Sequence, residues 1–310
     1  MTQTPRVPTV PAAQVPLTAA AITETLTALG VAGRTVMVHT SLSRLGYVVG
    51  AEAGVVQGVV DAVGPQGTVV MPAQSWQLCD PAFLQMPDVP AEWYPVLREH
   101  LPAYDPARTP TRTMGAVAEL FRTWPGVRRS AHPQRSVAAL GPLAERLTAV
   151  HDLDDAAGER SPMRALHDVG GYVLLLGVGF DRCTALHLAE NRIDWPTKHD
   201  VDQGGPVLRD GVRVWETWRE VWPEDEDFGE CGDAFCAAHP ELVHRARLGA
   251  ADAVLVPVRE LVAFATTWLA AARGGSVLVG AQHDAGASAE PGVPSVPGEA
   301  DAAAGVPRHS

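Results

Sequence analysis

Three side chains with acid–base or metal-binding chemistry lie close together in the segment RCTALHLAENRIDW. Cys183, His187 and Glu190 are four and three residues apart, so they would share one face of a helix. A histidine next to a carboxylate is typical of a general base. The spacing also occurs around structural histidines, and a metal site would need further ligands such as His167 or His199. No H-E-x-x-H or deaminase pattern is present, which disfavours a metal.

A second polar group follows an apolar run in the sequence VMVHTSLSRLG. His39, Thr40, Ser41 and Ser43 place side-chain donors beside backbone amides at the end of a predicted strand. Such a turn suits a phosphate or an amide-bearing chain, although serines and threonines in turns often only cap a helix.

A third segment, WETWREVWPEDEDFGECGD, combines eight carboxylates with three tryptophans. A solvated acidic loop is the simplest interpretation. Aromatic faces and carboxylates together also bind cationic sugars by stacking and charge-assisted hydrogen bonds, so this segment is a candidate acceptor site.

Alternating strand and helix patterns must position these groups, and they predict an α/β layer architecture. Helical apolar spacing occupies residues 17–30, 50–67, 113–124 and 184–193, whereas short buried-strand patterns occupy 35–38, 68–73 and 171–179. Residues 74–110 are rich in Pro, Trp and Asp and form a long irregular stretch of the kind that carries function. We expect a disordered leader at 1–17, one folded domain at 18–273 and a disordered low-complexity tail at 274–310.

Composition narrows the possible partners. The formal net charge of −12 disfavours nucleic acid and favours a cationic ligand. The four cysteines lack the close pairs of a zinc module or a disulfide framework, and no apolar run is long enough to cross a bilayer. We therefore expect a cytoplasmic protein without a membrane segment.

Several long motifs, in order along the chain, resemble the aminoglycoside 3-N-acetyltransferase family. They are VMVHTSLSRLG, AVGPQGTVVMPAQSW, YDPARTPTRTMGAVAELFR, PGVRRSAHPQRSVAALGPLAE, GERSPM, GGYVLLLGVG and TALHLAENRIDWPTK. They cover residues 17–198 well, and the likeness continues loosely to about residue 269.

The resemblance implies a single-domain, layered α/β/α fold with a mixed central sheet, distinct from the GCN5 fold. It implies acetyl-CoA as co-substrate, no metal, and a cationic aminosugar acceptor modified at its 3-amino group. His187 matches the catalytic histidine. Glu220 falls at the family's acidic position, but the Tyr and Asp that usually follow are replaced by Val221 and Trp222.

The resemblance and the acidic segment together indicate further site residues. The expected cofactor-binding residues are His39, Thr40, Ser41, Leu42, Ser43, Arg112 and Thr113. The expected substrate-binding carboxylates are Asp80, Asp225, Asp227 and Glu230.

The expected mechanism is direct transfer from the thioester with His187 as general base. Glu220, in preference to Glu190, is predicted to hold its imidazole ring. A covalent acetyl-enzyme on Cys183 is disfavoured. The alternatives are an acetyltransferase acting on another amine metabolite, a deacetylase or amidase that uses the same histidine, and a non-catalytic aminoglycoside-binding protein.

Overall fold

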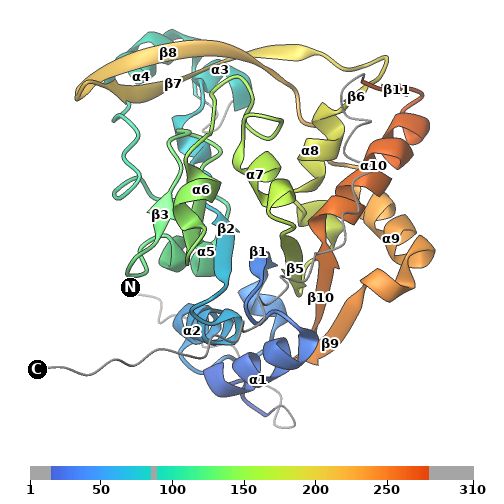
Figure 1. Cartoon of the computed structure of the whole chain (residues 1–310). Coiled ribbons are helices and arrows are strands. Elements are labelled where there is room, and N and C mark those ends of the chain that lie inside the picture. Colours follow the sequence, from blue (N-terminus) through green and yellow to red (C-terminus); the bar gives the residue numbers. More distant parts are fainter. Residues whose placement is uncertain (1–14, 85–88, 279–310) are drawn as a thin grey trace, which may run out of the picture.

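A seven-stranded mixed sheet forms the centre of the protein (Figure 1). The computed structural model describes residues 15–84 and 89–278. The strand order is β3-β4-β2-β1-β5-β10-β9. The strands are β1 Thr35–Thr40, β2 Thr68–Pro72, β3 Arg128–Arg129, β4 Val137–Leu140, β5 Tyr172–Leu176, β9 His244–Leu248 and β10 Ala251–Pro257. Strands β2, β1 and β5 are parallel, and each remaining pair is antiparallel.

Helices cover both faces of this sheet because successive strand residues point to opposite sides. Val36 and Val38 of β1 pack with one apolar cluster, whereas Met37 between them packs with the other. The first cluster contains side chains of α1 Ala19–Leu29, α2 Ala51–Val63 and α5 Gly115–Phe121. The second contains those of α6 Ala144–Thr148, α7 Pro162–Asp168, α8 Leu186–Asn191, α9 Phe228–Ala238 and α10 Val258–Ala272. The predicted α/β/α layering with a mixed sheet is therefore confirmed.

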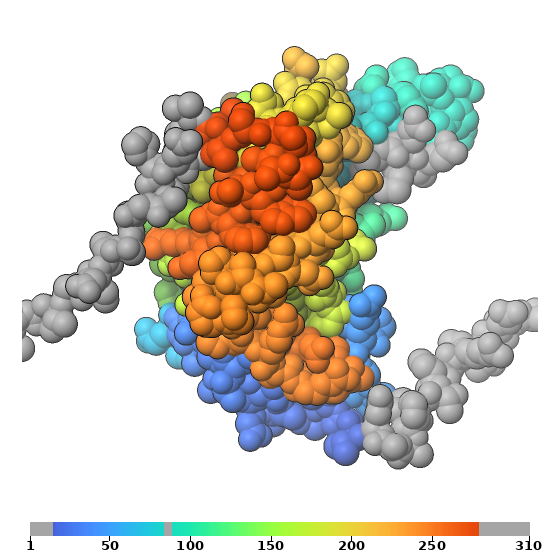
Figure 2. Space-filling view, turned by 90° about the vertical axis from the view of Figure 1, so that its right-hand side faces the viewer, coloured from blue at the N-terminus to red at the C-terminus, as the bar shows by residue number. Residues whose placement is uncertain are grey.

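The C-terminal elements form a continuous surface on one side of the molecule. Figure 2 shows α10 in red above the orange segment of α9 and β9, with the blue N-terminal elements below. Helix α1 contacts β9, so the first helix and the last strands of the sheet lie together. No helix in the described ranges is long and apolar enough to cross a membrane.

Local signals set the ends of several helices. Thr18 caps α1 by accepting a hydrogen bond from the Ala21 amide, and Gly30 ends this helix in the left-handed conformation with φ +102°. Helix α8 is shorter than predicted. It begins at Leu186, and Cys183 lies before it, at the end of the 3₁₀ turn η4 Phe180–Arg182. Cys183 therefore does not share a helix with His187, in contrast to the sequence-based expectation.

The stretch expected to be irregular contains short helices separated by turns. These are η2 Trp76–Leu78, α3 Pro81–Leu84, η3 Ala91–Trp93 and α4 Tyr94–His100. Two further 3₁₀ turns are η1 Leu42–Arg44 and η5 Pro240–Leu242.

A long hairpin crosses one end of the sheet and was not predicted. Strands β7 Asp200–Arg209 and β8 Val212–Val221 pair along their whole length. Asp210 and Gly211 join them with φ values of +52° and +77°, the signature of a type I′ turn. Trp215, Trp218 and Glu220, expected in a loop, are therefore strand residues whose direction is fixed by the β pleat.

The folded body extends slightly beyond both expected ends. Leu17 is buried and bridges to Val48, and β11 Ser276–Val277 pairs with β6 Ile193–Asp194. The rest of the predicted leader, residues 1–14, and of the predicted tail, residues 279–310, lies outside the described residues.

Candidate active site

A histidine–carboxylate pair lies within one turn of α8. The Nδ1 atom of His187 is 2.7 Å from Oε2 of Glu190. Because an ionised carboxylate only accepts hydrogen bonds, Nδ1 carries the proton and Nε2 is the basic nitrogen. The ring packs against Phe228 of α9, with the two centroids 4.8 Å apart. Helix α9 also packs closely on η4 because residue 232 is glycine, whose added Cβ would lie 2.0 Å from the Phe180 ring.

Glu190 is held by groups from distant parts of the chain. Its Oε1 accepts a hydrogen bond from the Glu224 amide at 2.7 Å and one from Arg273 at 3.0 Å. Arg273 also makes a two-point ion pair with Asp227, at 2.8 and 2.7 Å. Burial alone would raise the pKa of Glu190, but the hydrogen bonds and the charge of its partners outweigh this effect and lower the pKa. Glu190 is therefore ionised although only 1% exposed.

Glu220, the carboxylate that the sequence analysis preferred, makes different contacts. Its Oε1 lies 2.8 Å from Nη2 of Arg135, and its Oε2 accepts a hydrogen bond from the Trp218 indole at 3.2 Å. The carboxylate that hydrogen bonds to His187 is Glu190. The physical reason is that Arg135, a full cation, occupies the carboxylate of Glu220.

His187, Glu190 and Glu220 nevertheless border one small cavity of about 20 Å³. Its lining residues are Arg135, Asp154, Ala156, Ala157, His187, Glu190, Asn191, Glu220, Val221 and Pro223. The cavity therefore brings together a base, three carboxylates and one guanidinium.

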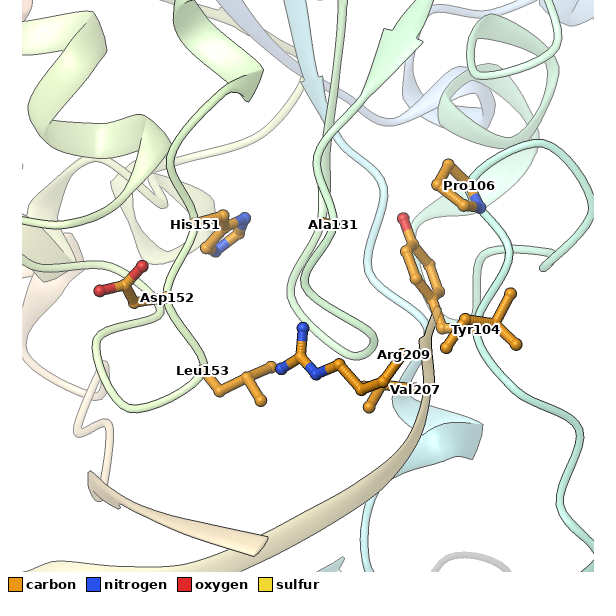
Figure 3. Close-up of a pocket in the computed structure, with 9 residues that line it drawn as sticks. Tyr104, Pro106, Ala131, His151, Asp152, Leu153, Val207 and Arg209 are labelled. Atoms are coloured by element: carbon orange, nitrogen blue, oxygen red, sulfur yellow. The ribbon is translucent and has the colours of Figure 1, made fainter. Parts of the chain in front are cut away.

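A larger cavity of about 490 Å³ is bordered by residues 151–153 (Figure 3). It is lined by Tyr104, Pro106, Ala131, His151, Asp152, Leu153, Val207, Leu208 and Arg209. Residues 151–153 border this cavity, and residues 154, 156 and 157 border the small one. One short loop thus forms part of the wall of both.

Buried histidines hold this loop. The Nδ1 atom of His151 lies 2.8 Å from the Ser130 hydroxyl, and its Nε2 lies 2.8 Å from the carbonyl oxygen of Ala156. The centroid of its ring lies 4.7 Å from the centroid of the His132 ring. Burial lowers the pKa of His151 to about 4 and also lowers the pKa of His132, so both rings are neutral near pH 7.

The expected cofactor turn contains two buried polar atoms with no partner. Within the described residues, Nε2 of His39 and Oγ1 of Thr40 make no hydrogen bond. Burial also lowers the pKa of His39 to about 4. Ser41 and Ser43 face each other, with their hydroxyl oxygens 3.3 Å apart, and Leu42 begins η1. These two atoms, which lack a hydrogen-bond partner in the protein, could be satisfied by a ligand that has donor and acceptor groups of its own. Neither cavity described above is lined by this turn.

Arg112 and Thr113 are exposed, and only the backbone of Arg112 is anchored, by a hydrogen bond to the Gln74 carbonyl at 2.8 Å. Thr113 has a φ of +69°, in the left-handed region that non-glycine residues seldom adopt. Such strain is frequent at ligand sites. The Thr113 hydroxyl donates a hydrogen bond to the Arg112 carbonyl oxygen at 2.5 Å.

The four carboxylates expected to bind substrate divide into two kinds. Asp80 accepts two hydrogen bonds of 2.8 Å from Arg98, and Asp227 pairs with Arg273, so both are already neutralised. Asp225 and Glu230 are exposed. None of the four lines either cavity.

Cys183 is 1% exposed, and burial raises the pKa of its thiol to about 12. The neutral thiol is a poor nucleophile. Across the described residues, no group of three or more His, Cys, Asp or Glu side chains could hold a metal ion.

Sequence reasoning missed Arg135, Asp154 and Arg273. Arg135 lies inside one of the matched motifs, HPQRSVAALG, but no local spacing links it to Glu220, 85 residues further on. In the sequence, Arg273 marks only the expected end of the folded domain.

Several known proteins are similar to this chain in sequence and in fold. The family model described as aminoglycoside 3-N-acetyltransferase matches residues 37–270. The SPbeta prophage-derived aminoglycoside N(3')-acetyltransferase-like protein YokD of Bacillus subtilis is 43% identical over 82% of this chain and 92% of its own length. Its crystal structure superposes with a TM-score of 0.80 at 42% identity, over 84% of this chain and 96% of that one.

Two further proteins show the same likeness in sequence or structure. Aminoglycoside N(3)-acetyltransferase VII of Streptomyces paromomycinus is 38% identical over 82% of this chain and 92% of its own length. The structure of AAC-IIIb in binary complex with CoASH is 34% identical, with a TM-score of 0.73, over 83% of this chain and 97% of that one. These likenesses define the protein as an acyltransferase, with a fold distinct from the GCN5 type. More specifically, the chain belongs to the aminoglycoside 3-N-acetyltransferase family, as its motifs predicted.

Proposed function

We propose that the protein transfers the acetyl group of acetyl-CoA directly to the 3-amino group of a deoxystreptamine aminoglycoside, with His187 as general base. The observation that carries this proposal is the 2.7 Å hydrogen bond between Nδ1 of His187 and Glu190 at a cavity bordered by carboxylates. Family membership supplies the reaction class, and the net charge of −12 favours a polycationic acceptor.

An aminosugar amine is mostly protonated near pH 7 and attacks only as the free base. In the proposed step, the amine nitrogen forms a bond to the thioester carbonyl carbon, and Nε2 of His187 takes the amine proton. The carbon–sulfur bond then breaks, and CoA leaves as its thiolate. Glu190 stabilises the imidazolium that forms, because it is already ionised and bonded to Nδ1. Such base assistance contributes about 10²–10⁴-fold in rate.

Direct transfer is supported by the burial of Cys183, whose raised pKa leaves no thiolate to accept the acetyl group. The turn from His39 to Ser43 is proposed to contact acetyl-CoA, since its orphaned polar atoms need partners. Arg112 and Thr113 complete the proposed cofactor residues, and the exposed Asp225 and Glu230 are proposed to attract the cationic acceptor.

A thiol-release assay with acetyl-CoA and tobramycin, gentamicin, kanamycin or neomycin tests this function. We expect CoA release with at least one drug and a loss of kcat of about 10²–10⁴-fold in His187→Ala. The matched control is His244→Ala, an exposed histidine on the edge strand β9. Drug binding without CoA release would favour a binding protein, and CoA release only with another amine would favour the metabolite alternative.

A further inference from the structure

A cation of the protein itself lines the small cavity beside His187. The Arg135 guanidinium lies 2.8 Å from Glu220, and its central carbon stands 4.8 Å from the centroid of the Trp76 ring. The side chains of Arg135 and Glu220 are 9% and 4% exposed. The Nε atom of Arg135 is buried and has no partner within the described residues. The guanidinium is therefore held by one carboxylate and one aromatic face.

The backbone beneath Arg135 is held by hydrogen bonds that do not involve the guanidinium. Nδ1 of His132 accepts hydrogen bonds from the Gln134 and Arg135 amides at 3.2 and 3.1 Å. The Gln134 side chain is tied to the carbonyl oxygen of Gly204 in the β7–β8 hairpin at 2.7 Å. The loop therefore stays in place while the long arginine side chain can turn about its own bonds.

The cavity is too small for an acceptor as it stands. Its volume of about 20 Å³ holds about one water molecule. An aminosugar ring can reach His187 from this side only if a wall group moves. Arg135 is the lining side chain whose place another cation can take, because an ammonium group also donates hydrogen bonds to a carboxylate.

We propose that Arg135 determines acceptor specificity by occupying, in the free enzyme, the place on Glu220 that a second ammonium group of the acceptor takes on binding. This inference rests on the proposed function, because it concerns the route of the acceptor to His187. The exchange leaves Glu220 paired throughout, which matters because a buried charge without a partner is costly. The attacking amine must be a free base, so the amine that replaces Arg135 must be a different, protonated one. The site therefore selects acceptors with at least two amino groups.

Calorimetry of tobramycin binding without acetyl-CoA tests the exchange. Arg135→Ala leaves Glu220 free for the drug, and we expect Kd to fall about tenfold. Arg135→Lys keeps a cation and should stay close to the wild type. Arg219→Ala is the matched control: it removes the same charge from the same region, but Arg219 is exposed and pairs only loosely, at 3.6 and 3.8 Å, with Asp202 and Asp200. Equal or weaker binding by a folded Arg135→Ala protein would overturn the proposal.

Two further measurements keep the test decisive. If Arg135→Ala fails to fold, Arg135→Gln, which retains volume and a donor to Glu220, should still bind the drug more tightly than the wild type. In the double variant Arg135→Ala with Glu220→Gln, the tightening should vanish. If the double variant binds as tightly as Arg135→Ala, Glu220 is not the exchanged carboxylate and the proposal fails.

The relative affinity for acceptors with one or two amino groups is a measurement that a purely structural role of Arg135 and Glu220 would not change. With the wild type, 2-deoxystreptamine, which has two amines, should bind more tightly than glucosamine, which has one, and Glu220→Gln, which removes the carboxylate that the second ammonium uses, should narrow this difference. Absence of CoA release with the wild type, together with the expected tightening, would refute the proposed reaction alone. CoA release with unchanged binding by Arg135→Ala would refute this inference alone.

Discussion

Glu190 joins His187 and Arg273 through opposite oxygens of one carboxylate, at 2.7 and 3.0 Å. Two residues of one helical turn are thereby tied to a cation 83 residues further along the chain. The imidazole orientation depends on this long-range contact as well as on its own helix.

The two carboxylates near His187 should differ in the kinetic constant that they control. In the proposed mechanism, Glu190→Gln removes the charge that stabilises the imidazolium, so we expect kcat to fall about 10²-fold with little change in KM. Glu220→Gln leaves Arg135 without its counter-charge, so KM for a polycationic drug should rise more than kcat falls. Steady-state kinetics on the two variants measures this split. The reverse pattern would assign the support of His187 to Glu220.

Arg273 should contribute strongly to stability. Arg273→Met leaves two carboxylates, Glu190 and Asp227, without their shared cation, and breaking a buried pair in this way costs about 3–5 kcal/mol. We expect Tm to fall by about 10 °C in thermal denaturation followed by circular dichroism. The control is Arg247→Met, an exposed pair partner of Asp252 for which a change within about 0.5 kcal/mol is expected. Equal shifts in the two variants would contradict the assignment.

Two truncations should behave differently although they differ by only six residues. A chain that ends at residue 278 keeps Arg273 and the pairing of β11 with β6, so its kcat should match that of the full chain. A chain that ends at residue 272 lacks both and should lose stability and turnover. The thiol-release assay and a melting curve on each chain decide this. Loss of turnover in the longer chain would show that residues beyond 278 are required.

Stability should decrease on mild acidification. The pKa values of His39 and His151 are lowered by burial from 6.5 to about 4, so both rings must stay neutral in the folded protein. Their contribution is fully present above pH 6.5 and is lost as the pH falls towards 4, at up to about 1.4 kcal/mol per pH unit for each ring.

Urea unfolding at pH 7.5, 6.5, 5.5 and 5.0 measures this loss. Carboxylates whose pKa values are lowered, such as Glu119 and Glu190, also lose their contribution on acidification, but mainly below their unfolded value of 4.5, so they add little to the loss above pH 5. His151→Asn should weaken the dependence, whereas replacing the exposed His244 should not. A free energy of unfolding that is constant across this range would contradict the prediction.

The elements that sequence predicted well are those whose signal is local. Helix α1 has helical apolar spacing, a threonine cap and a terminal glycine, and β5 is a continuous apolar run. The hairpin was missed because β8 is partly exposed on both faces, so WETWREV lacks clean alternation. In β7, Gly204, Gly205 and Pro206 have the composition of a turn.

In the candidate site, too, the sequence predicted local contacts but not long-range ones. The spacing of His187 and Glu190 placed both side chains within reach, and their 2.7 Å contact needs only one helical turn. The preference for Glu220 came from the family's acidic position and from reading Glu190 as a residue packed on its own helix, and neither shows that Arg135 pairs with Glu220. Which of several cations meets which carboxylate across more than 80 residues depends on tertiary packing, and local periodicity does not encode it.

The strand order also has a consequence for synthesis of the protein on the ribosome. Strand β5 lies between β1, made early, and β10, made near the end of the described chain, and α10 then leads directly to Arg273. A nascent chain that has emerged only as far as α8 already carries His187 and Glu190, but the cation that completes the carboxylate's partners has not yet been translated. The set of contacts around Glu190 is therefore completed only after α10 has been made, when all seven strands of the central sheet have already been translated.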